Sequence, residues 1–304
     1  VHGEGDDSRP QPNCRRSLAR DSTLTGAEGA GHGRPNGMFV ALNELLRLSV
    51  EQPERSKLIL LCATQTDASF LLHHFLSFYL KAGCKVCFLA FVQSFSHYNS
   101  VAQKLGVNLL TAKEQNQLVF FEGLKLANQV LFSDVQKSEE PNPFQFISED
   151  GSDLKQLYHF VRTSLNPSAD GYRWKFPVVI IDDPGVLLSL GVRLTDVLNF
   201  VHYCRATVNA ELKGNLVFLV RSSEASEDEE NELLGKALRH QAHSVLWAEG
   251  LASGYCKEVH GQLTILEKDS QESGGARDPR RVYQYQIQEK NVAFFARGMS
   301  AAML

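Results

Sequence analysis

The chain has 304 residues, of which 43% are hydrophobic and 22% are charged, a composition typical of a soluble globular protein with a substantial core. Its formal net charge of -4 at pH 7 excludes a global positive field, so any contact with nucleic acid needs a local basic patch. No apolar run reaches the roughly 20 residues of a membrane-spanning helix, and the six cysteines are scattered rather than spaced as a disulfide framework. We therefore expect no membrane association and a reducing compartment: the cytoplasm, with the nucleus as a second location.

The first 37 residues form a polar leader. They begin with Val1, are rich in Gly, Ser, Arg and Asp, and show no helical or strand periodicity, whereas Met38 directly precedes the amphipathic run FVALNELLRL. A basic arm for nucleic acid is disfavoured because five arginines in this leader are matched by five acidic residues. We expect residues 1–37 to be disordered and to lie upstream of the native start, with a single domain over residues 38–304.

From Met38 onward, buried strands alternate with helices. Unbroken apolar runs predict strands that are covered on both faces, at residues 58–62, 85–91, 117–123, 177–182, 215–221 and 244–250. Apolar residues spaced three and four apart predict helices between them, at residues 70–83, 154–165 and 194–208. This alternation is typical of a doubly wound α/β fold.

The pattern changes after Gly261. QLTILEK and VYQYQIQEKNVAFFARG alternate with a period of two, which predicts antiparallel strands at one edge of the sheet. We therefore predict an α/β fold: a mostly parallel sheet covered by helices on both faces, with a C-terminal antiparallel β-hairpin extension. The segments 139–144 and 269–279 are predicted loops.

The turn after the first strand stands where many nucleotide-binding proteins hold phosphate. A phosphate loop needs G-x-x-x-x-G-K-[ST], because glycines let the backbone close on the phosphates, Lys reaches the terminal phosphate and a hydroxyl holds magnesium. Here Ala63 and Ala68 take the glycine positions, Ser69 takes the lysine position and Phe70 replaces the hydroxyl. Asp67 adds repulsion of roughly 4 kcal/mol for a phosphate about 4 Å away. The turn therefore predicts helix capping, not nucleotide binding.

Two further positions bear on whether the chain could bind and hydrolyse a nucleotide. Asp182 ends the fourth apolar run, where phosphate-loop ATPases place a magnesium-orienting carboxylate, although Asp183 and Pro184 also form an ordinary turn signal. After the second run, where a RecA-like ATPase has an acidic general base, Val92 and Gln93 stand instead, and neither can accept a proton from water. Asp182 is interpreted as the remnant of an ATPase architecture without catalytic residues.

No metal centre is predicted. Cys84 and Cys87 are three residues apart at a strand start and so face opposite sides of a sheet. His240 and His243 could share one face of a helix end, but no third ligand is evident nearby, which favours a histidine at a helix C-terminus.

Long ordered stretches of the chain resemble one known family. The stretches include CATQTDASFLLHHFLSFYLKAGCKVCF, FVQSFSHYNSVAQKLGV, NFVHYCRATVNAELKGN, AEGLASGYCKEVHGQL and YQYQIQEKNVAFFARGMS. From Met38 to Leu304 they are similar to the Elongator complex protein 6 family, the RecA-like accessory subunits of Elongator.

The resemblance implies a RecA-like domain without an ATPase signature, a pseudo-ATPase with no cofactor. It also implies assembly with two related accessory subunits into a hetero-hexameric ring that binds tRNA, docks on the Elongator core and supports its modification of wobble uridines. Basic residues near strand or helix ends are candidate RNA contacts, namely Arg193, Arg205 and Arg221. The alternative is a divergent NTPase that uses Asp182 and a partner's residues at a ring interface.

Overall fold

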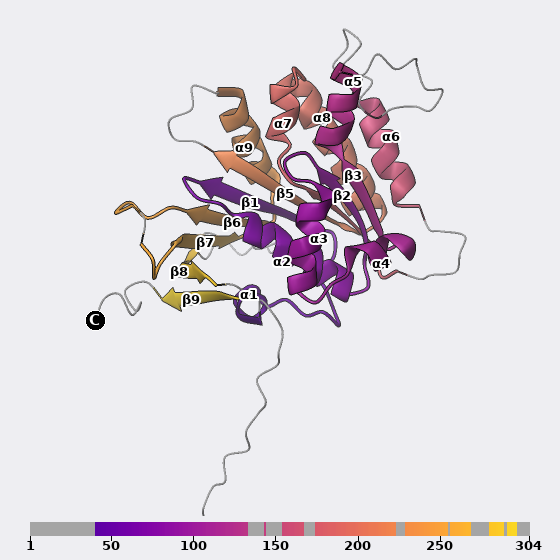
Figure 1. Cartoon of the computed structure of the whole chain (residues 1–304). Helices are drawn as coiled ribbons and strands as arrows, with labels where there is room; N and C mark the ends of the chain where they lie inside the picture. Colours follow the sequence, from indigo (N-terminus) through magenta and orange to yellow (C-terminus); the bar gives the residue numbers. More distant parts are fainter. Residues whose placement is uncertain are drawn as a thin grey trace, which may run out of the picture. The chain divides into compact units, whose positions relative to one another are not determined.

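In the described residues, nine strands form one sheet with the order β3-β2-β4-β5-β1-β6-β7-β8-β9. The computed structural model (Figure 1) describes residues 40–132, 143, 154–166, 174–222, 229–254, 256–268, 280–288 and 291–296. The strands are β1 (Leu58–Thr64), β2 (Lys85–Ala90), β3 (Leu118–Glu122), β4 (Pro177–Ile181), β5 (Asn215–Ser222), β6 (Ser244–Glu249), β7 (Gly261–Glu267), β8 (Arg280–Ile287) and β9 (Val292–Ala296). The predicted leader 1–37 and, apart from Pro143, the two predicted loops lie outside these residues and stay predictions.

The first six strands are parallel, and the last three are not. Each neighbouring pair among β1 to β6 runs in the same direction, whereas β7, β8 and β9 each run antiparallel to the strand before them. This confirms the predicted mostly parallel sheet with an antiparallel C-terminal extension. The extension has three strands, because the first of them, β7, pairs with β6 and leaves β8 and β9 to form the hairpin.

Helices cover both faces of the sheet (Figure 1). They are α1 (Val40–Leu46), α2 (Ser69–Lys81), α3 (Phe95–Lys104), α4 (Leu109–Glu114), α5 (Gly123–Phe132), α6 (Lys155–Ser164), α7 (Gly185–Ser189), α8 (Leu194–Cys204) and α9 (Glu229–Gln241). Helices α2, α3 and α4 contribute to one buried cluster, and α5 to α9 contribute to the other on the opposite face. The three predicted helices correspond to α2, α6 and α8.

Helix α2 is the most buried of these covering helices. Its residues from Phe70 to Leu80 are all buried, including His73, His74 and Ser77, which agrees with apolar residues on every side of the helix because such a helix must be enclosed. Helix α8 continues into a π-helical segment, Arg205–Glu211, where Asn209 turns inward and donates to the Lys57 and Gly214 carbonyl oxygens. The predicted helix at 194–208 therefore changes its winding before it ends.

Among the helices that the structure describes, none is both long and apolar enough to cross a bilayer.

Candidate functional site

The turn between β1 and α2 is held by a local contact of Asp67 with Ser69, while the N-cap residue of α2, Ala68, makes no side-chain cap hydrogen bond. The Asp67 carboxylate accepts from the Ser69 N–H at 2.9 Å and from the Ser69 hydroxyl at 2.6 Å. Ala63 and Ala68 are buried, and Phe70 points into the core with 6% of its surface exposed. The side chains at the glycine and hydroxyl positions of a phosphate loop are thus part of the interior, and the carboxylate occupies the helix start.

The antiparallel extension closes over this turn. The Tyr285 hydroxyl of β8 lies 3.0 Å from the Thr66 hydroxyl, and the Tyr285 ring packs 5.0 Å from the Phe70 ring. Tyr285 is fully buried. A Cβ added at Gly250 would lie 2.8 Å from the Gln65 carbonyl oxygen, so the chain after β6 also presses closely on the turn. The space in which a phosphate loop would contact its ligand is therefore bordered by packed side chains.

The Asp182 carboxylate, at the end of β4, binds the loop that follows β2. Its oxygens accept from the Phe91 and Val92 N–H groups and, at 2.7 Å, from the Tyr98 hydroxyl. Asp182 is completely buried, and this burial raises the pKa of its carboxyl group to about 6, although the hydrogen bonds from Tyr98 and the backbone oppose the rise. The carboxylate that would orient magnesium in an ATPase holds two strands of its own fold together here.

Asp183 has an unusual backbone conformation. Its φ of 123° is rarely adopted by residues other than glycine. The Asp183 carboxylate accepts from the Gly185 N–H at 3.0 Å and pairs with the Arg221 guanidinium at 3.1 Å. Burial raises the pKa of Asp183, and the positive charge of Arg221 opposes the rise. This network fixes the ends of β4 and β5 to each other.

The three predicted RNA-contact arginines all have partners within the chain. Arg221 pairs with Asp183, and the Arg193 Nε lies 2.7 Å from the Asp196 carboxylate on the same helix. The Arg205 guanidinium lies 3.4 Å from the Gln241 side-chain oxygen. Arg193 and Arg205 are the N-cap and C-cap residues of helix α8, and a rise of 1.5 Å per residue separates them by about 18 Å, so the structure does not bring them together. Their role in RNA contact stays a prediction.

The predicted cysteine and histidine pairs take structural positions. Cys84 belongs to one buried cluster and Cys87 to the other, as expected for residues three apart on a strand. His243 lies beyond the end of α9, and its Nδ1 accepts from the Leu58 N–H at 2.9 Å. His240 lies in the last turn of α9, the helix C-terminal position that the sequence favoured, and the less favoured shared helix face does not form because α9 ends at Gln241. In the described residues no group of three or more ligating side chains could hold a metal ion.

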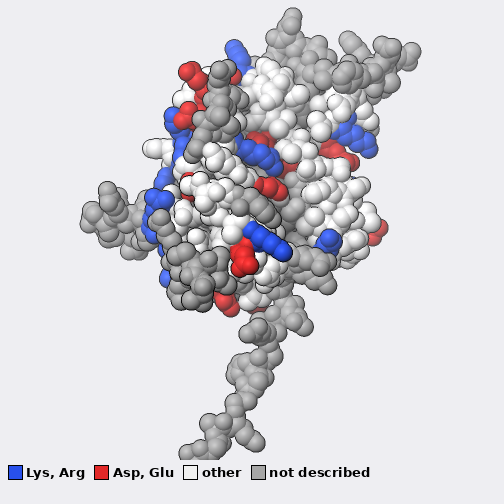
Figure 2. All heavy atoms as spheres, turned by 60° about the vertical axis from the view of Figure 1, so that its left-hand side comes forward, with Lys and Arg blue, Asp and Glu red and all other residues white. Residues whose placement is uncertain are grey.

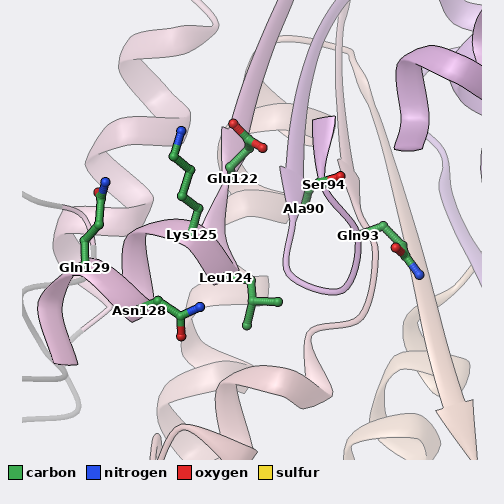
Figure 3. A pocket seen from close by; sticks show the side chains of 8 residues that line it. All are labelled: Ala90, Gln93, Ser94, Glu122, Leu124, Lys125, Asn128 and Gln129. Atoms are coloured by element: carbon green, nitrogen blue, oxygen red, sulfur yellow. The ribbon is translucent and has the colours of Figure 1, made fainter. Parts of the chain in front are cut away.

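A cleft of about 430 Å³ opens beside this region, at the carboxyl ends of β2 and β3 (Figure 3). Its lining comes from the end of β2, the loop that precedes α3, the end of β3 and helix α5. Glu122 and Lys125 point in the same direction from β3 and α5 in Figure 3, while Gln93 points away from them. The Glu122 carboxylate accepts from the Phe95 N–H at 3.1 Å. Sequence reasoning missed this cleft, because its lining residues form no motif and meet only through the strand order.

Figure 2 brings forward the side toward which β1 and β5 point in Figure 1. On this face, the blue and red side chains are intermixed in the middle of the view, and the blue side chains gather along its left border. The middle of this face therefore offers no continuous positive surface to a polyanion.

Comparison with known proteins gives one family. The model of the family described as Elongation complex protein 6 matches residues 39–289. Elongator complex protein 6 of Xenopus laevis is 56% identical over 267 residues, which cover 88% of this chain and 100% of that protein. The protein of the same name from Homo sapiens is 55% identical over 269 residues, which cover 88% of this chain and 100% of that protein. The one from Dictyostelium discoideum is 24% identical over 313 residues, which cover 80% of this chain and 90% of that protein.

A solved structure also resembles the chain. An uncharacterized protein from Pyrococcus horikoshii, crystallised in complex with an unknown peptide, aligns with a TM-score of 0.50 at 13% identity, and the alignment covers 83% of this chain and 96% of that one. At this identity the likeness shows the fold alone, and it agrees with the predicted α/β class with a mostly parallel sheet.

Proposed function

The chain belongs to the Elongator complex protein 6 family, and from this membership we propose that it is a non-catalytic accessory subunit of Elongator. It joins two related RecA-like subunits in a hetero-hexameric ring that binds tRNA, docks on the Elongator core and supports the modification of wobble uridines. The ring acts in the cytoplasm and also in the nucleus, without membrane attachment.

The observation that carries the non-catalytic part is the internal use of Asp182. Both of its oxygens are engaged by the loop after β2, and the residue is fully buried. Orienting magnesium would require that the carboxylate leave these donors, and each lost hydrogen bond to a charged group costs roughly 1.5–3 kcal/mol. The turn after β1, where the Asp67 carboxylate accepts from the Ser69 N–H, supports the same conclusion.

The alternative is a divergent NTPase that completes its site with residues of a neighbouring subunit. One observation favours it: Asp182, Asp183 and Arg221 are kept close together at the carboxyl edge, where ring ATPases assemble their sites. In this reading, a partner supplies the groups that the β1–α2 turn lacks.

A nucleotide titration on the purified ring separates the two. Ligand at a concentration of 100 times its Kd stabilises a folded protein by about 2.7 kcal/mol, so a nucleotide site on this subunit would visibly raise its unfolding temperature. We expect ATP with magnesium to leave the unfolding of this subunit unchanged. Loss of hydrolysis in an Asp182→Asn ring that assembles normally would establish the NTPase reading and refute ours.

A further inference from the structure

Acidic and basic side chains are unequally distributed between the two edges of the parallel sheet. Acidic side chains end or follow the strands β1, β3, β4 and β6 at the carboxyl edge: Asp67, Glu122, Asp182, Asp183 and Glu249. Helix α9 adds Glu229, Glu230 and Glu232 in its first turn. At the amino edge, basic side chains precede or flank the strand starts: Arg47, Lys57, Lys175, Arg239 and Lys268. Cations also lie at the carboxyl edge, where Arg221 pairs with Asp183, so the amino edge differs by its cluster of cations around one cleft.

The amino edge contains a cleft of about 210 Å³ between the starts of β1, β5 and β6. Its apolar floor includes Phe75, Phe78, Tyr79 and Leu246, and Arg47, Lys57, His243 and Lys268 also line it. The two acidic residues of its lining already have basic partners. Glu54 lies 3.7 Å from Lys57, and Glu267 lies 2.7 Å from Arg281.

His243 connects the cleft to the sheet. Because its Nδ1 accepts from the Leu58 N–H, the neutral ring carries its proton on Nε2 and can donate there. Burial is the main cause that lowers the pKa of His243, and the positive charges of Lys57, Arg205 and Lys268 lower it further. Several cations therefore lie close enough to act on one ring.

Lys268 is held at the same place by the end of α9. Its Nζ donates to the Arg239 and His240 carbonyl oxygens at 3.0 and 2.8 Å. An ammonium group has three N–H donors, so these two bonds leave one for a ligand. Arg47, whose left-handed φ of 53° places it in a turn after α1, is exposed beside it.

We propose that the cleft ringed by Arg47, Lys57, His243 and Lys268 binds a phosphate group. A guanidinium, two ammonium groups and an imidazole N–H supply the donors that phosphate oxygens require. At the carboxyl edge, where ligands of such sheets usually bind, Arg221 is already paired with Asp183, and Asp67 would repel a phosphate beside the turn after β1. The assignment of this phosphate to the backbone of tRNA rests on the proposed function. The other source is a free phosphate or a small phosphate ester.

The first test uses the full chain and inorganic phosphate. NMR titration of the His243 ring should give a higher pKa in phosphate than in chloride of equal ionic strength, because a bound anion offsets the charges of Lys57, Arg205 and Lys268. The neighbouring acids Glu54 and Glu267 are present in both buffers and so cannot produce this difference. An unchanged pKa, or an equal rise in an Arg47→Gln, Lys268→Gln double variant, refutes the site.

The second test uses the assembled ring and distinguishes the two sources. Arg47→Gln and Lys268→Gln should each weaken tRNA binding about 3- to 10-fold and flatten its dependence on salt by about one phosphate contact. The matched control Lys236→Gln, which removes an exposed cation of α9 outside the cleft, should change neither.

The remaining outcomes are separable. If the His243 pKa rises in phosphate but tRNA binding is unaffected by the cleft variants, RNA is refuted as the source and a small phosphate ester is established in its place. If the unmodified ring binds no tRNA, the proposed function fails, while the phosphate titration still decides whether the cleft is a site.

Discussion

At the scale of single residues, Asp182 makes stability depend on pH in an unusual direction. Burial raises the pKa of its carboxyl group from 3.8 to about 6, so the protonated form is favoured in the fold. The stability that this group contributes is fully present below pH 3.8 and is lost as the pH rises through 6. We expect the Asp182→Asn variant to be less stable than the unmodified chain at pH 5, and the difference to shrink by about 1 kcal/mol by pH 8.

Urea denaturation at the two pH values measures this difference. Asp67→Asn, at an exposed carboxylate that also accepts a backbone N–H, controls for the exchange of an aspartate for its amide. A difference that stays constant or widens toward pH 8 would show that Asp182 is ionised in the fold throughout this range.

His73 acts in the opposite direction. It is buried in α2, with ring centroids 5.6 Å from His97 and 5.2 Å from Tyr98. Burial chiefly, and then the charge of His97, lowers the pKa of His73 to about 4, while Asp67 opposes this. Stability is therefore present above the ordinary value of 6.5 and is lost as the pH falls toward 4.

The His73→Phe variant keeps a ring in this space and removes the titrating group. Between pH 8 and pH 5 its unfolding free energy should fall by about 2 kcal/mol less than that of the unmodified chain. The same exchange at His202, an exposed histidine of α8 that is not in contact with His73, supplies the control. An unchanged pH dependence in His73→Phe would mean that His73 can accept a proton without leaving the core.

At the scale of elements, two glycines predict opposite responses to the same substitution. Before β5, a Cβ at Gly214 would lie 2.1 Å from the Pro177 carbonyl oxygen, so the neighbouring strand β4 would have to move. Within α9, a Cβ at Gly235 would meet only Val220 Cγ1 at an ordinary 3.7 Å. We expect Gly214→Ala to destabilise the fold by about 3 kcal/mol.

Gly235→Ala should stabilise the protein by about 0.5–1 kcal/mol, because alanine loses less backbone entropy in a helix. Thermal denaturation of both variants provides the comparison, and each serves as the control of the other. A loss of stability in Gly235→Ala would indicate that a neighbouring segment of the protein packs directly against the backbone of α9 at Gly235.

Elements that depend on neighbouring residues in the chain could be predicted from the sequence, whereas contacts between residues far apart in the chain could not. Apolar runs and spacings located the six parallel strands and helices α2, α6 and α8, because burial on both faces leaves a local pattern in sequence. The contact of Thr66 with Tyr285 joins residues 219 positions apart, and no local pattern announces it. The partners of Asp182 and the amino-edge cleft were invisible for the same reason, since strand order alone brings their residues together.

At the scale of the whole molecule, the distribution of charge predicts that an isolated chain binds RNA more weakly than the proposed ring does. The net charge is -4, and the basic residues of the amino edge form one small cluster, so an isolated chain can neutralise few phosphates. A ring that presents several such edges to one RNA binds it through the phosphate contacts of all its subunits. Its affinity therefore rises although no single subunit gains a contact.

We therefore expect the isolated chain to bind tRNA weakly, and the ring to bind it at least about 100-fold more tightly. The plot of log affinity against log salt should also be steeper for the ring, because each additional phosphate contact adds about 0.7–0.9 to the slope. Fluorescence anisotropy at several salt concentrations measures both quantities, and a ring with Arg47→Gln in every copy of this subunit is the matched control. If the isolated chain binds as tightly and with the same slope as the ring, the contacts are not shared, and one subunit must carry a complete RNA site of its own.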